Sequence, residues 1–203
     1  MSNKKIFFKN CVFLVWENVY EPAEDTFLFA ENLEVKKGAL VLEMGTGCGI
    51  LGILAAKKAF NVVAVDINPH AVRCAKENAK LNKVSNKMHF VCGDLFTPLK
   101  ADEKFDLILF NPPYLPSEPD ENESWLVLAW SGGTTGRQTV ERFIDEAPNY
   151  LKSGGAILLL QSTLSNIDET IRKFEEKGLK TNILAERDLP FFEKIALIKA
   201  QAC

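Results

Sequence analysis

Residues 105–114 read Phe-Asp-Leu-Ile-Leu-Phe-Asn-Pro-Pro-Tyr, and the fold can be read outward from them. The apolar run 105–110 is typical of a strand buried inside a parallel sheet. The strand ends here because proline lacks an amide donor, and the first proline also pushes Asn111 out of helical space. We therefore expect Asn111 at the carboxyl end of a central strand, where open α/β sheets bind ligands. The alternative is an ordinary Pro-Pro loop in which Asn111 caps its own backbone.

Apolar strands alternate with helices on both sides of this stretch. Helices are predicted from the glycine loop after residue 44 to Ala59, and over residues 69–81, 140–151 and 168–176, with Ser153-Gly154-Gly155 ending the helix over 140–151. Strands are predicted over residues 39–42, 62–65, 88–92, 105–110, 156–160, 179–184 and 195–199. This alternation predicts an α/β fold, a doubly wound, mostly parallel seven-stranded sheet with helices on both faces. No helix separates the last two strands, which predicts an antiparallel last strand.

Residues 1–33 are expected to form a short extension before a core of residues 34–203. Two strands joined at Lys9-Asn10 are followed by a helix with Pro22 in its first turn and acids at its positive end. Helix-start chemistry does not explain why Asp25 is followed by Thr26 instead of a plain helix former. Without a repeat or linker, the sequence predicts one domain over residues 1–203.

Charge, cysteine spacing and hydropathy argue against nucleic-acid-binding, metal-binding and membrane proteins. The 203 residues carry a net charge of −3, which argues against a protein that grips nucleic acid by its own charge. Five scattered cysteines without C-x-x-C spacing and two isolated histidines predict free thiols and no metal site. The absence of a transmembrane-length apolar run or signal peptide predicts a soluble, cytoplasmic protein with no membrane contact.

The segment 115–138 is the longest irregular stretch of the chain. It carries Trp125, Trp130 and a glycine group over residues 132–136. Loops of this length are usually functional or disordered, and two tryptophans argue against simple disorder.

A glycine loop, Gly45-Thr46-Gly47-Cys48-Gly49, lies between a predicted strand and a predicted helix. Such a loop forms a nucleotide site, because glycines let a ligand approach the backbone amides. Residues 47–52 also match the dinucleotide fingerprint, so the loop alone leaves an NAD-dependent enzyme open.

Acids follow the first three core strands: Glu43, Asp66 and Asp94. Asp66 can accept two hydroxyl hydrogen bonds from a ribose, while Asp94 and the Leu95 amide can bind an adenine. A ring of acids suits a positively charged ligand without phosphates, and S-adenosylmethionine has this chemistry. Structural alternatives are a loop acid at Asp66, a turn residue at Asp94, and a Glu43 that merely accepts amide hydrogens of the glycine loop.

Together these motifs resemble those of class I S-adenosylmethionine-dependent methyltransferases. Within that class the chain resembles the HemK-type release-factor glutamine N5-methyltransferases of the archaeal and eukaryotic branch. The resemblance covers nearly the whole chain and is carried by residues 20–26, 43–49, Asp66, 94–95 and 111–114.

The resemblance implies a cofactor, a site and partners. Thr26 would bind the methionine end of S-adenosyl-L-methionine, Glu43 and Gly45 its amino-acid portion, and Asn111 both cofactor and target. The implied cofactor site is Thr26, Glu43, Gly45, Gly47, Asp66, Asp94, Leu95 and Asn111. The implied partners are a translation release factor as substrate and a small zinc-binding activator protein in a heterodimer.

The catalytic residues are predicted to be Asn111, Pro112 and Tyr114. The Asn111 side-chain oxygen and the Pro112 carbonyl would each accept one hydrogen of the target NH2 group, while Tyr114 packs flat against the amide. Fixing the nitrogen in this way needs no general base. The same two acceptors also fit an adenine N6 amine, and some relatives act on lysine, so these substrates stay open. A cofactor-binding protein without catalysis is a further alternative.

Overall fold

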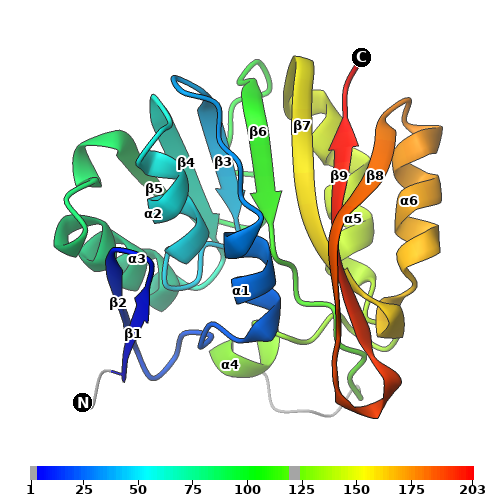
Figure 1. Cartoon of the computed structure of the whole chain (residues 1–203), viewed down its shortest axis with the longest axis horizontal. Coiled ribbons are helices and arrows are strands. Elements are labelled where there is room, and N and C mark those ends of the chain that lie inside the picture. Colours follow the sequence, from blue (N-terminus) through cyan, green and yellow to red (C-terminus); the bar gives the residue numbers. More distant parts are fainter. Residues whose placement is uncertain (1–3, 119–123) are drawn as a thin grey trace.

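A seven-stranded sheet organises the protein, whose computed structural model describes residues 4–118 and 124–203. The strands lie in the order β5-β4-β3-β6-β7-β9-β8, with β6 in the middle (Figure 1). All neighbours pair in parallel except β9, which runs antiparallel to both β7 and β8. The strand bounds are β3 (Leu40–Met44), β4 (Asn61–Asp66), β5 (Met88–Cys92), β6 (Phe105–Phe110), β7 (Leu151–Ser162), β8 (Lys180–Asp188) and β9 (Lys194–Gln201). The predicted fold class and antiparallel last strand are confirmed.

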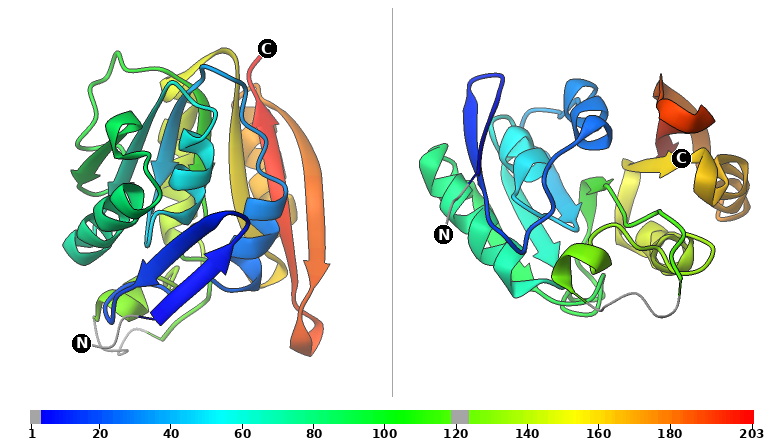
Figure 2. Two further views of the ribbon diagram at one scale, coloured as in Figure 1. Left: turned by 60° about the vertical axis from the view of Figure 1, so that its left-hand side comes forward. Right: turned by 90° about the horizontal axis from the view of Figure 1, so that it is seen from below.

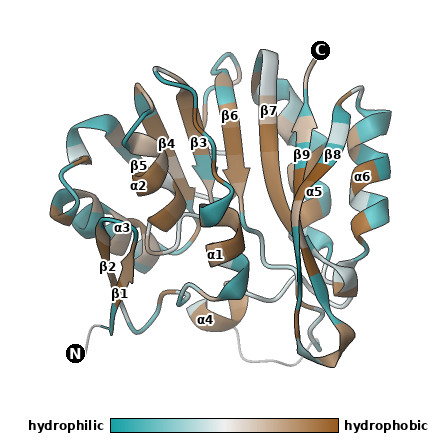
Figure 3. Ribbon diagram, in the orientation of Figure 1, coloured by the Kyte–Doolittle hydropathy of each residue, from teal (hydrophilic) through white to brown (hydrophobic). Residues whose placement is uncertain are grey.

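Helices cover both faces of this sheet (Figure 2). On one face pack α1 (Glu24–Glu31), α2 (Ile50–Ala56) and α3 (Pro69–Leu81). On the other pack α5 (Gln138–Glu146) and α6 (Ile167–Glu176). Side chains of a strand point alternately to its two faces. In β3, Val41 therefore packs in the core beneath α1, α2 and α3, whereas Leu42 and Met44 pack in the core beneath α5 and α6. The central strands are accordingly hydrophobic along their length, whereas α6 is largely hydrophilic outside (Figure 3).

The N-terminal extension forms a hairpin of β1 (Lys4–Phe8) and β2 (Cys11–Val15), as predicted. It is fastened to α3 by two buried asparagines. Asn78 exchanges hydrogen bonds with the Leu14 backbone, and Asn82 does the same with Val12. Asn78 also donates to the Cys48 carbonyl at 2.8 Å, which ties the hairpin to the glycine loop.

Three local expectations were wrong. Pro22 lies before α1, whose N-cap is Ala23. The helix predicted over 140–151 ends at Glu146, because Pro148 continues the chain as a 3-10 turn, Ala147–Tyr150. Residues 153–155, expected to terminate that helix, lie inside β7, where Gly154 has a φ of +70°.

Candidate functional site

The carboxyl ends of the parallel strands β3 to β6 meet at one edge of the sheet, beside α1 and the short helix α4 (Trp125–Leu128) (Figure 1). A cavity of about 370 Å³ opens at this edge. It is lined by all eight residues of the predicted cofactor site: Thr26, Glu43, Gly45, Gly47, Asp66, Asp94, Leu95 and Asn111. Residues spread over 86 positions of sequence are thus brought together.

Glu43 holds the glycine loop. Its side chain is 1% exposed; Oε1 accepts from the Gly52 amide at 2.7 Å and Oε2 from the Thr46 hydroxyl at 2.5 Å. A Cβ at Gly52 would lie 2.3 Å from Glu43 Oε2, so this approach requires glycine. Burial raises the pKa of Glu43 to about 7 from an ordinary 4.5, although both hydrogen bonds lower it. Glu43 therefore accepts an amide hydrogen at the glycine loop, as the structural alternative predicted. Its contact with a cofactor stays a prediction.

Asp66 joins the end of β4 to the glycine loop. Its Oδ2 accepts from the Gly47 amide at 2.8 Å, and its Oδ1 from the Asn68 amide at 2.8 Å. Burial raises the pKa of this carboxyl above its ordinary value, against the effect of the two amides. Each carboxylate oxygen has further acceptor capacity. Asp66 lines the cavity, and its contact with two ribose hydroxyl groups stays a prediction.

Asp94 lies at the far wall of the cavity, paired with a residue that the sequence did not single out. Its Oδ2 accepts from the Arg142 guanidinium of α5 at 2.6 Å, and both side chains are about half exposed. Leu95 follows with a φ of +46°, an uncommon backbone conformation for a leucine. The Asp94 carboxylate is therefore paired with another residue that lines the cavity, while its contact with an adenine stays a prediction.

A second cavity of about 340 Å³ adjoins the first. Its lining includes the three predicted catalytic residues, Asn111, Pro112 and Tyr114, together with Asp25 and Trp130. Asn111 lines both cavities, so it lies at their junction. A group bound in the second cavity would meet a ligand of the first at this side chain.

Asp25 is a site residue that the sequence reasoning missed. It is 5% exposed and accepts hydrogen bonds from the Asn111 side chain at 3.0 Å, from the Tyr20 hydroxyl at 3.1 Å, and from the Tyr114 hydroxyl at 3.5 Å. Burial, followed by the charge of Asp25, raises the pKa of both tyrosines, so they are neutral donors. The sequence signal that could have identified Asp25 was its position before Thr26, which the chemistry of a helix start does not explain. Thr26 itself is 4% exposed, with its hydroxyl between Asp25 and Asn111.

The irregular segment 115–138 is held across the mouth of the site. The Leu115 amide donates to the Trp130 carbonyl at 3.0 Å, and the Gly132 amide to the Leu115 carbonyl at 2.9 Å. Trp125 and Leu128 of α4 line the larger cavity, and Trp130 the smaller. Residues on both sides of 119–123, which lie outside the described part of the chain, therefore line the two cavities.

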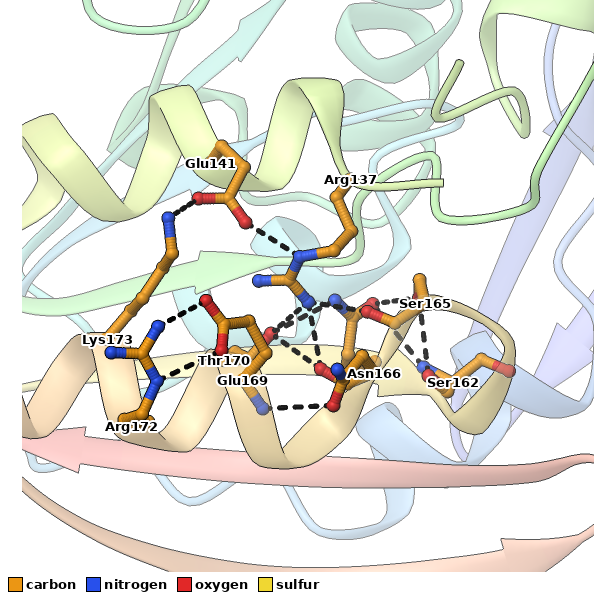
Figure 4. A network of polar contacts seen from close by, with 10 residues as sticks. Arg137, Glu141, Ser162, Ser165, Asn166, Glu169, Thr170, Arg172 and Lys173 are labelled. Carbon is orange, nitrogen blue, oxygen red and sulfur yellow. Dashed lines mark hydrogen bonds and ion pairs between the residues drawn. The ribbon is translucent and has the colours of Figure 1, made fainter. Parts of the chain in front are cut away.

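A polar network anchors the end of this segment to α6 (Figure 4). The Arg137 side chain is 11% exposed and donates from Nε to Glu141 at 2.6 Å. One of its terminal nitrogens donates to the carbonyls of Ser165 and Asn166 and to the Thr170 hydroxyl, at 2.5, 2.8 and 3.0 Å. The network places the first turn of α5, where Gln138 and Thr139 line the larger cavity. It is a structural feature that fixes one wall of the site.

The donor set of the larger cavity fits S-adenosylmethionine better than a dinucleotide. Among its described lining residues three are acidic, and the single basic one, Arg142, is already paired with Asp94. A pyrophosphate needs free donors, whereas a ribose diol, an adenine amine and a positive methionine end need acceptors. Acidic acceptors at the ends of β3, β4 and β5 match the second set.

Two kinds of feature, a membrane-spanning helix and a metal-binding cluster, are absent from the described residues, 4–118 and 124–203. No helix there is long and apolar enough to cross a membrane. No group of three or more His, Cys, Asp or Glu residues is arranged to hold a metal ion.

Comparison with known proteins agrees with this geometry. The family described as "Methyltransferase small domain" matches residues 19–126. A putative protein N5-glutamine methyltransferase of Methanocaldococcus jannaschii is 50% identical, over 90% of this chain and 91% of its own length. The methyltransferase HEMK2 of Homo sapiens is 36% identical, over 81% of each chain.

Among solved structures, one similar chain belongs to the E. cuniculi Mtq2–Trm112 complex, described as responsible for methylation of the translation termination factor eRF1. It superposes with a TM-score of 0.71 and 26% identity, over 92% of this chain and 99% of that one. The fold, the acid-lined cavity and these relatives lead to one assignment. The chain belongs to the methyltransferase small domain family and, within it, to the HemK-type, S-adenosylmethionine-dependent protein-glutamine N5-methyltransferases.

Proposed function

We propose that this protein methylates the side-chain nitrogen of a glutamine, the Gln of a Gly-Gly-Gln segment in a translation release factor. The observation that carries the proposal is the Asn111 side-chain oxygen. It is a buried atom of a residue that lines both cavities, and it has no hydrogen-bond partner among the described residues. A buried acceptor without a donor is costly, so it calls for an N–H group supplied by a bound target.

The site activates a nitrogen by positioning alone. A bound cofactor would supply a methyl group from a positively charged sulfur, which leaves as a neutral thioether, while the methylated nitrogen gives up one of its two hydrogens as a proton to solvent. The Asn111 oxygen accepts one hydrogen of the target NH2, and the Pro112 carbonyl is proposed to accept the other, which turns the nitrogen lone pair toward the larger cavity. Tyr114 flanks the amide, and α4 with the segment after it shields the junction from water. Such positioning accelerates the methyl transfer without a general base.

The residues already named are proposed to bind the cofactor. Asp66 would accept the ribose hydroxyls, Asp94 and the Leu95 amide would bind the adenine, and Thr26 and Glu43 would lie at the methionine end. Gly45 and Gly47, with φ values of +63° and +55°, open the loop for this ligand.

A methyl-transfer assay with matched peptides tests the substrate. Labelled cofactor is offered with a Gly-Gly-Gln peptide, with Gly-Gly-Glu and Gly-Gly-Lys peptides, and with adenine-containing DNA, and the labelled residue is mapped by mass spectrometry. We expect label on the glutamine alone, because glutamate has no N–H to give Asn111. Transfer to DNA or lysine but not to glutamine, in the peptide or the intact release factor, would contradict the assignment.

We further propose a heterodimer with a small zinc-binding activator protein. The solved structure of Mtq2 is a complex with Trm112. In this chain β5 pairs only with β4, so one side of it is a free edge for a partner strand within the described sheet. The N-terminal hairpin offers one exposed phenylalanine, Phe7, because Phe13 is fully buried and Phe8 stacks on Phe27.

Co-expression with such an activator tests this partner. Phe90→Glu on β5 should abolish a complex that survives Phe7→Glu on β1, and zinc measured in the purified complex should match its activator content. A pure, fully active monomer at high dilution would contradict an obligatory partner.

Two broader expectations stay part of the proposal. We propose that residues 1–203 act as one methyltransferase domain, supported by the shared core in which β2 and α1 pack with β3 and α2. We also propose a cytoplasmic setting, where release factors act, supported by five free cysteines.

A further inference from the structure

The Asn111 side chain is held by its donor end. Its Nδ2 donates to Asp25 Oδ2 at 3.0 Å and lies 3.2 Å from the Thr26 hydroxyl oxygen. A side-chain amide has one donor end and one acceptor end, so fixing the nitrogen fixes where the oxygen points. The oxygen is one of three buried side-chain nitrogen or oxygen atoms that find no hydrogen-bond partner within residues 4–118 and 124–203; the others belong to Trp16 and Arg137.

Asp25 has its own orientation fixed by the backbone. Its Oδ1 accepts from the Thr26 amide at 2.6 Å, and this amide cannot turn away from the start of α1. Oδ2 then faces Asn111. Because an ionised carboxylate only accepts hydrogen bonds, it can bind the nitrogen of Asn111 but never the oxygen.

We infer that Asp25 is the positioning residue that turns Asn111 so that its oxygen, and not its NH2 group, faces the target nitrogen. The inference rests on the proposed function, in which that oxygen accepts a hydrogen from glutamine. By holding the Asn111 nitrogen, Asp25 leaves the Asn111 oxygen as the hydrogen-bond acceptor for the target. It thereby selects a target that carries an N–H over one that offers only oxygen.

This role predicts an unusual order among variants. In Asp25→Asn the side-chain oxygen must face the Thr26 amide, which leaves the NH2 group facing Asn111. Two NH2 groups cannot hydrogen-bond, so Asn111 turns over and presents its own NH2 to the target. In Asp25→Ala nothing forces the reversal, and Asn111 samples both orientations. The nearly isosteric variant should therefore be the worse enzyme.

The experiment measures kcat and KM for the Gly-Gly-Gln peptide, cofactor affinity by calorimetry, and the melting temperature. For Asp25→Asn we expect a fall in kcat of about 10²–10³, and of about tenfold for Asp25→Ala, by analogy with loss of one preorganised polar group. Cofactor affinity should stay within a few-fold. Glu24→Gln is the matched control: this neighbouring acid pairs with Arg187 at the surface, and the variant should keep wild-type rates. A residue that only stabilised α1 would give the opposite order, with Ala worse than Asn.

Side-chain amide NMR gives a readout that does not depend on activity. In the wild-type protein the two Nδ2 hydrogens of Asn111, assigned by their loss in Asn111→Ala, should exchange at least tenfold more slowly than those of an exposed asparagine. Asp25→Asn should shift them and remove that protection. Rapid exchange in the wild-type protein, or an Asp25→Asn variant with wild-type kcat, would overturn the positioning role. If the wild-type protein instead fails to methylate the peptide while the NMR result holds, the proposed substrate is wrong and the positioning role stands.

Discussion

The Gly47 amide nitrogen lies 2.8 Å from Oδ2 of Asp66, which ties the glycine loop after β3 to the end of the neighbouring strand β4. The loop and the carboxylate therefore form a single structural element that lines the larger cavity. Its geometry depends on β3 and β4 being adjacent and parallel, with Met44 opposite Val65.

Asp66→Ala should weaken S-adenosylmethionine binding by about 1.5–3 kcal/mol, the usual range for hydrogen bonds to a charged group. Calorimetry with the cofactor measures this directly. Asp145→Asn, an exposed acid on α5, serves as the control and should bind normally. Unchanged affinity in a folded Asp66→Ala protein would remove Asp66 from the site.

Asn111→Ala should reduce the rate of methyl transfer by about 10²–10³ while leaving cofactor affinity within a few-fold. The reason is that the Asn111 oxygen aligns the target more than it holds the cofactor. Asn111→Asp is a stricter test, since its negative charge would stabilise the sulfonium before transfer more than during it. Single-turnover rates on the Gly-Gly-Gln peptide separate chemistry from binding. A fully active Asn111→Ala enzyme would refute the mechanism.

Glu43→Gln should flatten the dependence of stability on pH. The pKa of Glu43 is about 7 in the folded protein and 4.5 ordinarily, so the folded state binds the proton more tightly. The free energy of unfolding therefore falls as pH rises from 4.5 to 7, by up to about 3 kcal/mol from this group. Glutamine keeps an acceptor for Gly52 and a donor for Thr46 without that slope.

Urea unfolding of the cofactor-free protein between pH 5 and 8 measures the effect. Glu77→Gln, an exposed acid of α3, should retain the wild-type profile. A Glu43→Gln protein with the same pH dependence as the wild type would show that Glu43 is ionised throughout.

Arg137→Lys should destabilise the protein by about 1–3 kcal/mol, because lysine cannot reproduce several buried hydrogen bonds of a planar guanidinium. The loss should also loosen the wall of the cavity at Gln138 and Thr139. Thermal unfolding and cofactor affinity check the two effects. Arg172→Lys, at a half-exposed side chain of α6, is the control and should change neither quantity appreciably.

Much of the site could be read from local sequence. The strand into Asn111, the glycine loop and the acids at the ends of β3, β4 and β5 all lie at the edge of the sheet where the sequence predicted them. This worked because prolines and glycines restrict the backbone locally, and because parallel strands place their carboxyl ends at one edge. Prediction failed at helix ends, as at Pro148 and at residues 153–155, where the tertiary position of β7 overrode local terminator signals.

The sequence by itself determined the alternation of strands and helices, hence the sheet, its binding edge and the residues that reach that edge. Only the tertiary structure decided which polar atoms meet there. Asp25 and Asn111 are 86 residues apart, and nothing local in either segment requires their contact. It arises because α1 packs against the sheet and carries the Asp25 carboxylate to the end of β6. There, buried polar groups must find partners, and Asn111 meets that requirement with the Nδ2 end of its amide, which donates to Asp25.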